Sequence, residues 1–453
     1  MKKALTLLLP RRSTLIVLGP LLAFAGTIAL GAMTLWMSQY GTPTAMSWLD
    51  ALFTATSATC VTGLSVIEVG QFDLTGQIIV LSLIQLGGLG IMTFGALLAL
   101  FLYHQVPLTE RLAVAESLLP DQTLKLGAFL LKLAGTTFCL ELFGATVLYL
   151  YAPRDFPPFS AVFHAVSAFC NAGFSLHATS LTAWRADLVI NVVFMGLIIL
   201  GGLGFTVLLE LSTRFRPRAR LSPLSWYTKM VLSTTLVLIL SGWMFLYYAE
   251  YLFAGLPLDP GEALLATLFQ SVSCRTAGFN TLNIGTMTNL SLLIMLLLML
   301  VGGGSGSCAG GLKLSTVRVL FGQLSAQVRG SDQCLVEGKA IDQATQQRAL
   351  LLFTFSIGIL FAAVVLLNLS EGIPLQPQQA RGQFAELLFE AVSAFCTVGL
   401  STGTTPTLGP MGKLVIIMLM YVGRLGPLAI LVSLRRLQPK QRYRYPERGM
   451  MVG

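Results

Sequence analysis

The chain has 453 residues, of which 55% are hydrophobic and 11% are charged, and its formal net charge is +9. Soluble proteins carry about 25% charged residues, so this composition excludes an ordinary soluble fold. Apolar runs of about 20 residues, the length that spans a bilayer, recur along the chain and indicate a polytopic membrane protein.

The basic residues lie in three clusters outside the apolar runs. Positive-inside sorting explains such clusters, so we expect no nucleic acid among the partners. The same positive-inside sorting predicts a multi-pass protein of the cell (inner) membrane with both termini in the cytoplasm. The last two clusters are candidates for contact with membrane lipids or a docking partner. The clusters are Lys2, Lys3, Arg11 and Arg12; Arg214, Arg216, Arg218 and Arg220; and Arg435, Arg436, Lys440, Arg442, Arg444 and Arg448.

The sequence shows no residues arranged for catalysis or for holding a resident metal. Its seven cysteines form no CxxC pair, and its three histidines form no cluster. No Ser/His/Asp or His/Asp/Glu constellation stands out, so we do not expect an enzyme. Cys60, Cys170 and Cys396 occupy the same place in a repeated motif, which favours a buried packing role over redox chemistry.

One short motif is written four times: a Ser, then a Gly five or six residues later, then Leu or Phe. Copies about a hundred residues apart suit four quasi-equivalent units around one axis rather than a solenoid. We expect these units to be residues 1–104, 105–212, 213–330 and 331–453, the last with a cytoplasmic tail. The copies begin at Ser57, Ser167, Ser273 and Ser393, and each has a Phe four residues upstream, at Phe53, Phe163, Phe269 and Phe389.

Each unit has the same expected layout: a spanning helix, a short helix that ends in the motif, and a second spanning helix. The short helices cannot span a bilayer and suit re-entrant pore helices that enter from outside. The predicted fold is an all-α polytopic membrane protein with eight full spans plus four pore helices, in pseudo-fourfold symmetry around a central ion pathway. The expected helices are 14–37, 48–59 and 76–102; 126–151, 160–169 and 188–211; 227–253, 262–274 and 289–320; and 348–369, 384–395 and 413–434.

The repeated motif suits a dehydrated cation. Such an ion needs a ring of oxygens in place of its water, and backbone carbonyls supply that ring in potassium channels. Glycine lets successive carbonyls point the same way, and each pore helix turns its partly negative end toward the same centre. One such Gly also fits helix packing or a tight turn, but four in register favour a selectivity filter. The expected potassium-binding residues are Cys60, Val61, Thr62, Gly63, Cys170, Asn171, Ala172, Gly173, Arg275, Thr276, Ala277, Gly278, Cys396, Thr397, Val398 and Gly399.

Four phrases of the sequence carry a resemblance to a known family. They are FQS at 269–271, RTAGFN at 275–280, LGGLGFTV at 200–207 and GRLGPL at 423–428. With the fourfold plan and one Gly per filter, the chain resembles the Trk/Ktr/HKT superfamily of potassium transporters over nearly its whole length. It starts directly with the first repeat, whereas TrkH-type members carry two extra N-terminal helices. The likeness is therefore greatest to the KtrB-type membrane subunits of bacterial Ktr systems.

This resemblance implies a pore-forming subunit that carries potassium inward across the cytoplasmic membrane through a gated pathway. It implies a homodimer on a KtrA-like cytoplasmic nucleotide-binding regulatory ring. Potassium is then the transported ion, sodium is an activator, and ATP or ADP acts only through the regulatory partner. One Gly per repeat also suggests a shorter and less selective filter than one with four carbonyl layers.

The second helix of the third unit is interrupted by residues 302–311, called the Gly/Ser loop. Six of its ten residues are Gly, and each costs about 1 kcal/mol in a helix relative to Ala. A packing kink is one interpretation; a nucleotide P-loop fits poorly, because the Gly-Lys-Ser/Thr ending and a preceding strand are missing. The resemblance implies a mobile gate. The expected gate residues are Gly302, Gly303, Gly304, Ser305, Gly306, Ser307, Cys308, Ala309, Gly310, Gly311 and Arg424.

Two arginines are expected inside the membrane. Arg424 lies about eleven residues into the last spanning helix, near the midplane, where an unpaired charge costs several kcal/mol. We expect it to contact carbonyls of the Gly/Ser loop and to oppose the passage of ions, with a purely structural role as the alternative. Arg275 has no acidic neighbour in the sequence, and we expect it to brace the third motif through a Glu or Asp of another repeat.

A second class of function is a sodium- or proton-coupled secondary cation transporter with alternating access, because broken helices near the midplane occur there too. Such a transporter often carries a membrane-embedded acid paired with a base. Glu141 is the acid that the sequence places in the membrane, and it stands alone in its helix. The gated potassium pathway is therefore favoured over a coupled secondary transporter.

Overall fold

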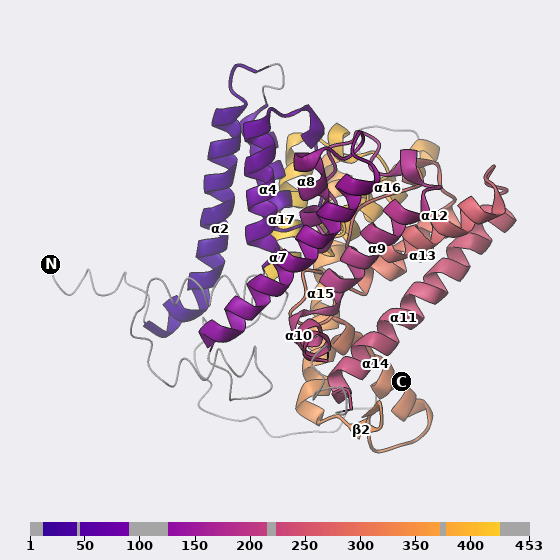
Figure 1. Cartoon of the computed structure of the whole chain (residues 1–453). Coiled ribbons are helices and arrows are strands. Elements are labelled where there is room, and N and C mark those ends of the chain that lie inside the picture. The colour runs from indigo at the N-terminus through magenta and orange to yellow at the C-terminus, as the bar shows by residue number, and fades with distance from the viewer. Residues whose placement is uncertain (1–11, 43–45, 90–125, 215–222, 372–376, 426–453) are drawn as a thin grey trace.

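The structure is a computed structural model, and it describes residues 12–42, 46–89, 126–214, 223–371 and 377–425. Helices make up most of this part of the chain (Figure 1). The strands among these residues, β1 (Leu335–Val336) and β2 (Lys339–Ala340), form one antiparallel hairpin. The expected helical class is confirmed.

Long and short helices follow one another in an order that recurs four times in the described chain. This recurrence is what a division into four units predicts, and the unit boundaries themselves stay a prediction. The helices are α2 (Arg12–Ser38), α3 (Trp48–Thr59) and α4 (Leu74–Gly88); α7 (Leu126–Tyr151), α8 (Pro158–Phe169), α9 (Leu188–Leu203) and α10 (Phe205–Thr213); α11 (Trp226–Tyr247) with a π-helical end (Tyr248–Phe253), α12 (Pro260–Ser273), α13 (Asn289–Leu300) and α14 (Leu314–Val328); and α15 (Gln343–Glu371), α16 (Pro377–Phe395) and α17 (Pro410–Leu425).

The helix contacts close a circle. Helix α4 contacts α8, α9 contacts α12, α13 contacts α16, and α17 contacts α3. Each contact joins a long helix of one set to the short helix of the next set, and the last set returns to the first. The short helices α3, α8, α12 and α16 are thereby held around a common centre.

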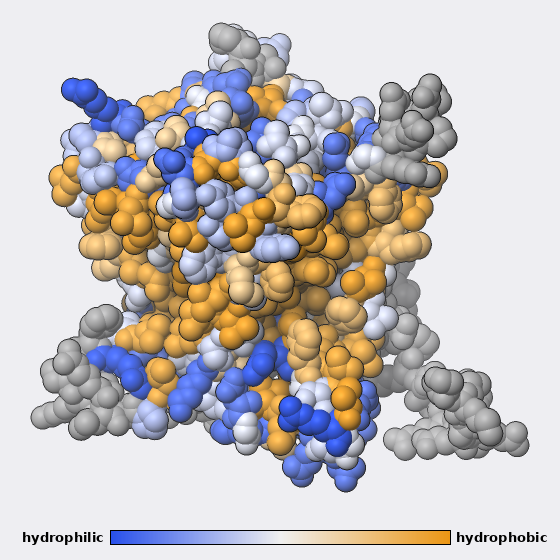
Figure 2. All heavy atoms as spheres, turned by 90° about the vertical axis from the view of Figure 1, so that its right-hand side faces the viewer, coloured by the Kyte–Doolittle hydropathy of each residue, from blue (hydrophilic) through white to orange (hydrophobic). Residues whose placement is uncertain are grey.

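Three described helices are long and apolar enough to cross a membrane: Leu131–Tyr151, Trp226–Phe253 and Gln343–Glu371. The pair Leu188–Leu203 and Phe205–Thr213 meets the same criterion together, although it is bent by 108°. Figure 2 shows one face of the molecule, on which apolar side chains form a band between two more polar ends. These features fit a polytopic membrane protein, and eight full spans stay a prediction.

The sequence predicts one continuous helix over residues 188–211, and this is wrong. The chain breaks at Gly204, whose φ of 95° and ψ of 149° are open to Gly and strained for other residues. The Gly/Ser loop pairs with the backbone groups at the break: Gly304 N donates to Gly202 O (3.0 Å), and Phe205 N donates to Gly306 O (3.2 Å). The third unit therefore contributes a partner that replaces the missing helical hydrogen bonds.

Some expectations lie outside the described residues. They concern the helix expected at 76–102 beyond Leu89, the helix expected at 413–434 beyond Leu425, and the side chains of the basic clusters other than Arg214. The side of the membrane on which the termini lie therefore stays a prediction.

Side-chain caps fix where three of the second long helices begin. Asp73, Asp187 and Thr288 each accept a hydrogen bond from the backbone N–H three residues further on, at 2.8, 3.0 and 3.2 Å. A cap of this kind satisfies a donor that the first turn of a helix leaves free. Each of these helices therefore starts at a defined point after the motif that precedes it.

Candidate functional site

Each short helix ends in a segment that carries the expected filter residues: 60–63, 170–173, 275–278 and 396–399, called the motif loops. Backbone φ is positive at the Gly of every loop and again two residues before it. Left-handed backbone at alternate residues lets successive carbonyls face one side, as an extended strand does not. The angles are 94° at Gly63, 71° at Gly173, 83° at Gly278 and 88° at Gly399, and 56° at Val61, 57° at Asn171, 67° at Thr276 and 48° at Thr397.

The non-glycine positions in this conformation are strained. A β-branched residue with positive φ is a genuine outlier, and such residues cost about 1–3 kcal/mol each. Val61, Thr276 and Thr397 are of this kind. Strain that recurs at equivalent positions of separate loops indicates a functional constraint on the backbone.

The motif Ser holds each strained loop through its own backbone carbonyl, which accepts from the N–H of the residue before the Gly. In the third loop, which is one residue shorter, this bond spans four residues instead of five, so the Gly keeps its place. The donors and acceptors are Thr62 and Ser57 (2.8 Å), Ala172 and Ser167 (2.7 Å), Ala277 and Ser273 (2.9 Å), and Val398 and Ser393 (2.8 Å).

The Ser hydroxyl binds the same loop a second time, which explains why every copy has a Ser. In the first and fourth loops Ser57 and Ser393 accept from the N–H of the motif Gly, both at 3.1 Å. In the second loop Ser167 donates to Phe174 O (2.8 Å). Ser273 donates to the equivalent carbonyl, that of Phe279, in the third.

The four loops meet in a ring. In each loop the carbonyl oxygen of the residue before the Gly lies against the Gly of a neighbouring loop, so closely that a Cβ atom has no room there. The separations from a Cβ placed on the Gly to that oxygen are 2.4 Å for Gly63 and Ala172, 2.8 Å for Gly173 and Ala277, 2.6 Å for Gly278 and Val398, and 2.0 Å for Gly399 and Thr62. Segments more than 300 residues apart thus close one circle of backbone oxygens.

A cavity of about 270 Å³, called the vestibule, adjoins one side of the ring. Its lining includes all four ring glycines. It also includes the residue two positions after each of them, and these are Ser65, Ser175, Asn280 and Ser401. Glu68 is the one acidic residue in the lining. A cation in the vestibule would therefore meet hydroxyl and amide groups and a carboxylate before it meets the carbonyls.

The position three residues before each Gly lies away from the vestibule. Cys60, Cys170 and Cys396 occupy it in three loops and are buried, as expected. Arg275 occupies it in the third loop, and its Nη2 donates to Gly302 O of the Gly/Ser loop (2.9 Å). The expected acidic partner of Arg275 is therefore wrong for the residues described. This contact links a motif loop directly to the Gly/Ser loop.

The Gly/Ser loop connects α13 to α14 and closes on itself. Gly302 N donates to Leu312 O (2.8 Å), and Leu314 N donates to Gly303 O (3.0 Å). The loop follows a helix rather than a strand, so the P-loop interpretation has no support. Its ends are pinned together, while its middle reaches the break at Gly204.

The same loop lies against the ring on the side away from the vestibule. A Cβ placed on Gly310 would lie 2.2 Å from Thr397 Oγ1 and 2.8 Å from Cys396 O. Cys308 Sγ donates to Gly88 O at 2.9 Å. Contacts with the first and fourth sets of helices place the loop across the centre of the circle.

Arg424 touches this loop as expected. Its guanidinium donates to the carbonyl oxygens of Cys308 in the loop and of Gly87 in α4. The Val-Gly-Arg-Leu-Gly string places Arg424 where Leu-Gly-Gly-Leu-Gly places Gly88 and Gly202 in the first two units. One unit thus has a long basic side chain at a position where two others have no side chain.

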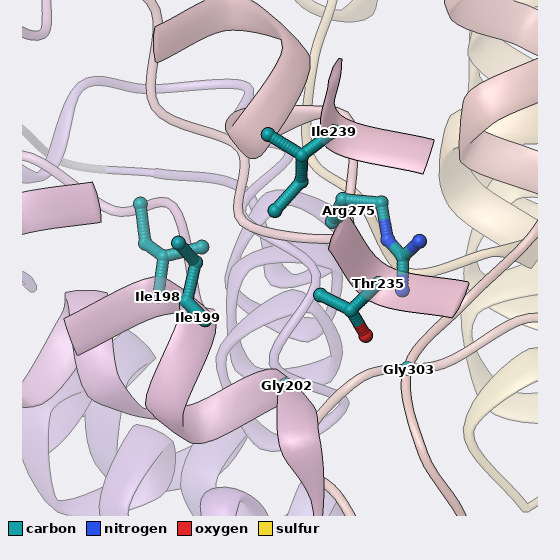
Figure 3. Close-up of a pocket in the computed structure, with 7 residues that line it drawn as sticks. All are labelled: Ile198, Ile199, Gly202, Thr235, Ile239, Arg275 and Gly303. Atoms are coloured by element: carbon teal, nitrogen blue, oxygen red, sulfur yellow. The ribbon is translucent and has the colours of Figure 1, made fainter. Parts of the chain in front are cut away.

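Lys313 also holds the loop and was not predicted. Its Nζ donates to Ala309 O (2.6 Å). Its place two residues after the ten-residue loop was the available signal. Arg275, which also binds the loop, lies beside Thr235, Ile239 and Gly303, where a void of about 10 Å³ remains (Figure 3). Three basic side chains therefore bind three different carbonyls of one loop.

Three buried carboxylates lie in helices of the described chain, and none forms a salt bridge there. Glu141 accepts from Gln85 Nε2 (3.2 Å) and Cys170 Sγ (3.8 Å). Glu250 and Glu390 were not predicted, and both are buried. No cluster of His, Cys, Asp and Glu that could hold a metal occurs among the described residues.

Comparison with known proteins identifies the family. A family model described as TrkH, cation transport protein, matches residues 23–444. The chain is 36% identical over 439 residues to the Ktr system potassium uptake protein B of Bacillus subtilis strain 168, covering 95% of each chain. It is 35% identical over 440 residues to the Ktr system potassium uptake protein B of Vibrio alginolyticus, covering 96% of this chain and 94% of that protein.

It is 35% identical over 419 residues to the potassium/sodium uptake protein NtpJ of Enterococcus hirae, covering 90% of each. The crystal structure of the potassium transporter TrkH from Vibrio parahaemolyticus shares the fold, with a TM-score of 0.73 and 20% identity over 95% of this chain and 86% of that one. The resemblance drawn from the motifs is confirmed. The chain belongs to the TrkH family of cation transport proteins.

Proposed function

We propose that the protein is the pore-forming subunit of a gated, Ktr-type system that carries potassium inward across the cell membrane. The observation that carries this proposal is the ring in which four glycines meet four neighbouring carbonyl oxygens. Neutral backbone oxygens around one centre suit a dehydrated monovalent cation. The relatives are named potassium uptake and potassium/sodium uptake proteins, and these names indicate potassium as the ion.

The order of the parts supports a pathway. An ion entering from outside meets the vestibule with Glu68, gives up water at the ring, and is then stopped by the Gly/Ser loop. Arg424 adds a positive charge to this barrier and ties the loop to α4. Opening requires the loop to leave Thr397 and Gly88, which it now contacts.

We infer a homodimer that sits on a KtrA-like cytoplasmic ring, with ATP or ADP acting through that ring and sodium as an activator. The relatives are named as parts of a Ktr system, which supports further components. Helix α14 begins just after the Gly/Ser loop and packs with the hairpin against α11, where Trp226 Nε1 donates to Val336 O (3.0 Å). A partner that moves this module acts on the adjoining loop.

The test has two parts. Expression in a bacterium that lacks potassium uptake should restore growth at low potassium. Purified protein in liposomes should then pass potassium without an imposed sodium or proton gradient. Flux that appears only with such a gradient would favour the coupled secondary transporter. None of the three buried carboxylates of the described helices, Glu141, Glu250 and Glu390, forms the salt bridge with a base that such a transporter often carries. Absence of potassium flux from folded protein, with its partner present, would refute the proposal.

A further inference from the structure

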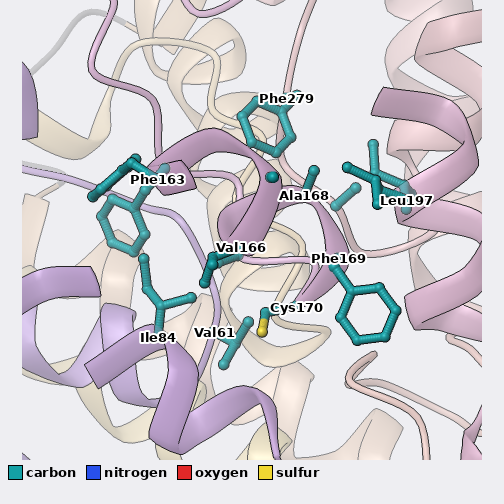
Figure 4. Close-up of a cluster of buried hydrophobic side chains, with 14 of the residues drawn as sticks. Val61, Ile84, Phe163, Val166, Ala168, Phe169, Cys170, Leu197 and Phe279 are labelled. Carbon is teal, nitrogen blue, oxygen red and sulfur yellow. The ribbon is translucent and has the colours of Figure 1, made fainter. Parts of the chain in front are cut away.

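Every short helix carries a polar residue directly after its motif Phe. The Phe side chain packs into the core, as Figure 4 shows for Phe163. The polar residue beside it is also fully buried in all four helices, although its chemistry differs. The four residues are Thr54, His164, Gln270 and Glu390.

Glu390 uses its carboxylate to hold the segment that follows the fourth motif loop. Its Oε1 accepts from Ser401 Oγ, from Thr402 N (3.2 Å) and from Thr404 Oγ1 (3.0 Å). Its Oε2 accepts from Thr405 Oγ1 (2.7 Å). All four donors belong to residues 401–405, which begin two residues after Gly399, and Ser401, Gly403 and Thr405 of this stretch line the vestibule. One buried side chain thus fixes the whole turn at the outer edge of this motif loop.

His164 makes the equivalent contact in the second unit. Its Nε2 lies 3.0 Å from Ser175 Oγ and accepts from Leu176 N (3.3 Å). Ser175 and Leu176 stand two and three residues after Gly173, as Ser401 and Thr402 stand after Gly399. A carboxylate and an imidazole therefore bind the same two positions.

The second and fourth units face each other across the ring, since Gly173 and Gly399 both contact Gly63 and Gly278. The other two units lack this support. Thr54 Oγ1 and both amide atoms of Gln270 have no hydrogen-bond partner among the described residues. The segment after the motif loop is thus held by four hydrogen bonds to Glu390 in the fourth unit and by two to His164 in the second. Thr54 and Gln270 give no such support in the first and third units.

We propose that Glu390 is a positioning residue that sets cation selectivity, because it fixes the backbone around Gly399. This inference rests on the proposed function. Gly399 makes the tightest contact in the ring, 2.0 Å from a placed Cβ to Thr62 O, so movement of its loop shifts two adjoining carbonyl positions. Hydrogen bonds to a carboxylate are about twice as strong as neutral ones. Discrimination between potassium and sodium depends on how oxygens are held around the ion.

The test compares Glu390→Gln with Glu371→Gln in full-length protein in liposomes, measuring potassium and sodium uptake. The Gln variant keeps the side-chain size but turns one acceptor into a donor that faces hydroxyl groups. We expect its potassium-to-sodium uptake ratio to fall about tenfold. Glu371 is a matched control, because its carboxylate accepts from Gly409 N (3.1 Å) in the same unit and lines no part of the vestibule. Its variant should keep the wild-type ratio.

Thr405→Val provides an independent variant if Glu390→Gln does not fold. It keeps the shape and removes one donor to Glu390, so the ratio should fall in the same direction by a smaller factor. Wild-type ratios in both Glu390→Gln and Thr405→Val, or an equal fall in Glu371→Gln, would overturn the inference. Wild-type protein that passes no potassium would instead refute the proposed function.

Discussion

The Arg424 guanidinium donates a hydrogen bond to the carbonyl oxygen of Cys308, and a second to that of Gly87. The first bond ties the last described helix to the Gly/Ser loop, and the second ties it to α4. Carbonyl dipoles of two other elements therefore satisfy a charge that is costly in a membrane. The arrangement holds the loop in place and keeps a positive charge on the proposed route of the ion.

Arg424→Ala should raise basal potassium flux, because it removes both hydrogen bonds and the charge. We expect an increase of about tenfold, the effect of losing about 1.4 kcal/mol of stabilisation of the closed loop. Arg424→Lys is the matched variant. It keeps the charge but loses the planar group that donates to two carbonyls at once, so the increase in flux should be smaller. Flux through liposomes without the regulatory partner measures both. Unchanged flux from folded Arg424→Ala protein would contradict a gating role.

Replacing ring glycines by Ser should lower the preference for potassium over sodium. The added Cβ must push away a neighbouring carbonyl, and the separations of 2.0, 2.4, 2.6 and 2.8 Å predict decreasing severity from Gly399 through Gly63 and Gly278 to Gly173. At Gly399 we expect a loss of about tenfold or more, because overpacking costs about 1–3 kcal/mol.

The control for the ring is Gly255→Ser. Gly255 also has a positive φ, 70°, but a Cβ there would meet no atom within 4 Å. It therefore reproduces the backbone strain without a close approach to a carbonyl. Equal selectivity in the Gly399→Ser and Gly255→Ser proteins would show that the contacts in the ring do not matter.

Three glycines of the second long helices should be required for stability. A Cβ on Gly87, Gly201 or Gly423 would lie 1.9, 1.8 or 1.8 Å from the last carbonyls of the short helices. Substitution by Ala should therefore destabilise the fold by about 1–3 kcal/mol or more, seen as a lower midpoint of thermal unfolding. Gly135→Ala and Gly358→Ala, in helices with open space at the Cβ, should be neutral or slightly stabilising. Similar midpoints for the two groups would disprove the close packing.

The ion pair between Lys413 and Asp50 should stabilise the closure of the circle, since it joins α17 to α3. The Nζ–Oδ1 distance is 2.6 Å, and the side chains are only 14% and 16% exposed. A double-mutant cycle with Ala should give a coupling of about 1 kcal/mol or more. The pair of Arg318 and Glu337, 36% and 34% exposed, should give about 0.5 kcal/mol or less. A larger coupling for Arg318 and Glu337 than for Lys413 and Asp50 would contradict a stabilising role of the Lys413–Asp50 pair.

Much of the fold could be predicted because the motif is repeated. Ser57, Ser167, Ser273 and Ser393 mark the ends of four short helices, and apolar length marks the long ones. The break at Gly204 could not be predicted, because Leu-Gly-Gly-Leu-Gly reads equally well as close helix packing. Its cause is the Gly/Ser loop, which supplies hydrogen bonds from a segment about a hundred residues away.

The side chains behind the ring were harder to predict. The partner of Arg275 is a backbone carbonyl, which leaves no trace in a sequence. Glu390 was missed although a signal existed. Three residues upstream of the motif Ser, a polar residue recurs in all four copies, as Thr54, His164, Gln270 and Glu390, and this recurrence was the available signal. The donors to Glu390 come from a Ser/Thr-rich turn whose conformation the sequence does not specify.

The most direct measurement is crystallography or electron diffraction with rubidium or thallium in place of potassium. These ions scatter strongly and mimic potassium, so they show where the protein replaces the hydration water of the ion. The account predicts one strong peak on the axis between Gly63, Gly173, Gly278 and Gly399, at the level of the adjoining carbonyls. Ions bound elsewhere, with that position empty at saturating concentration, would contradict it.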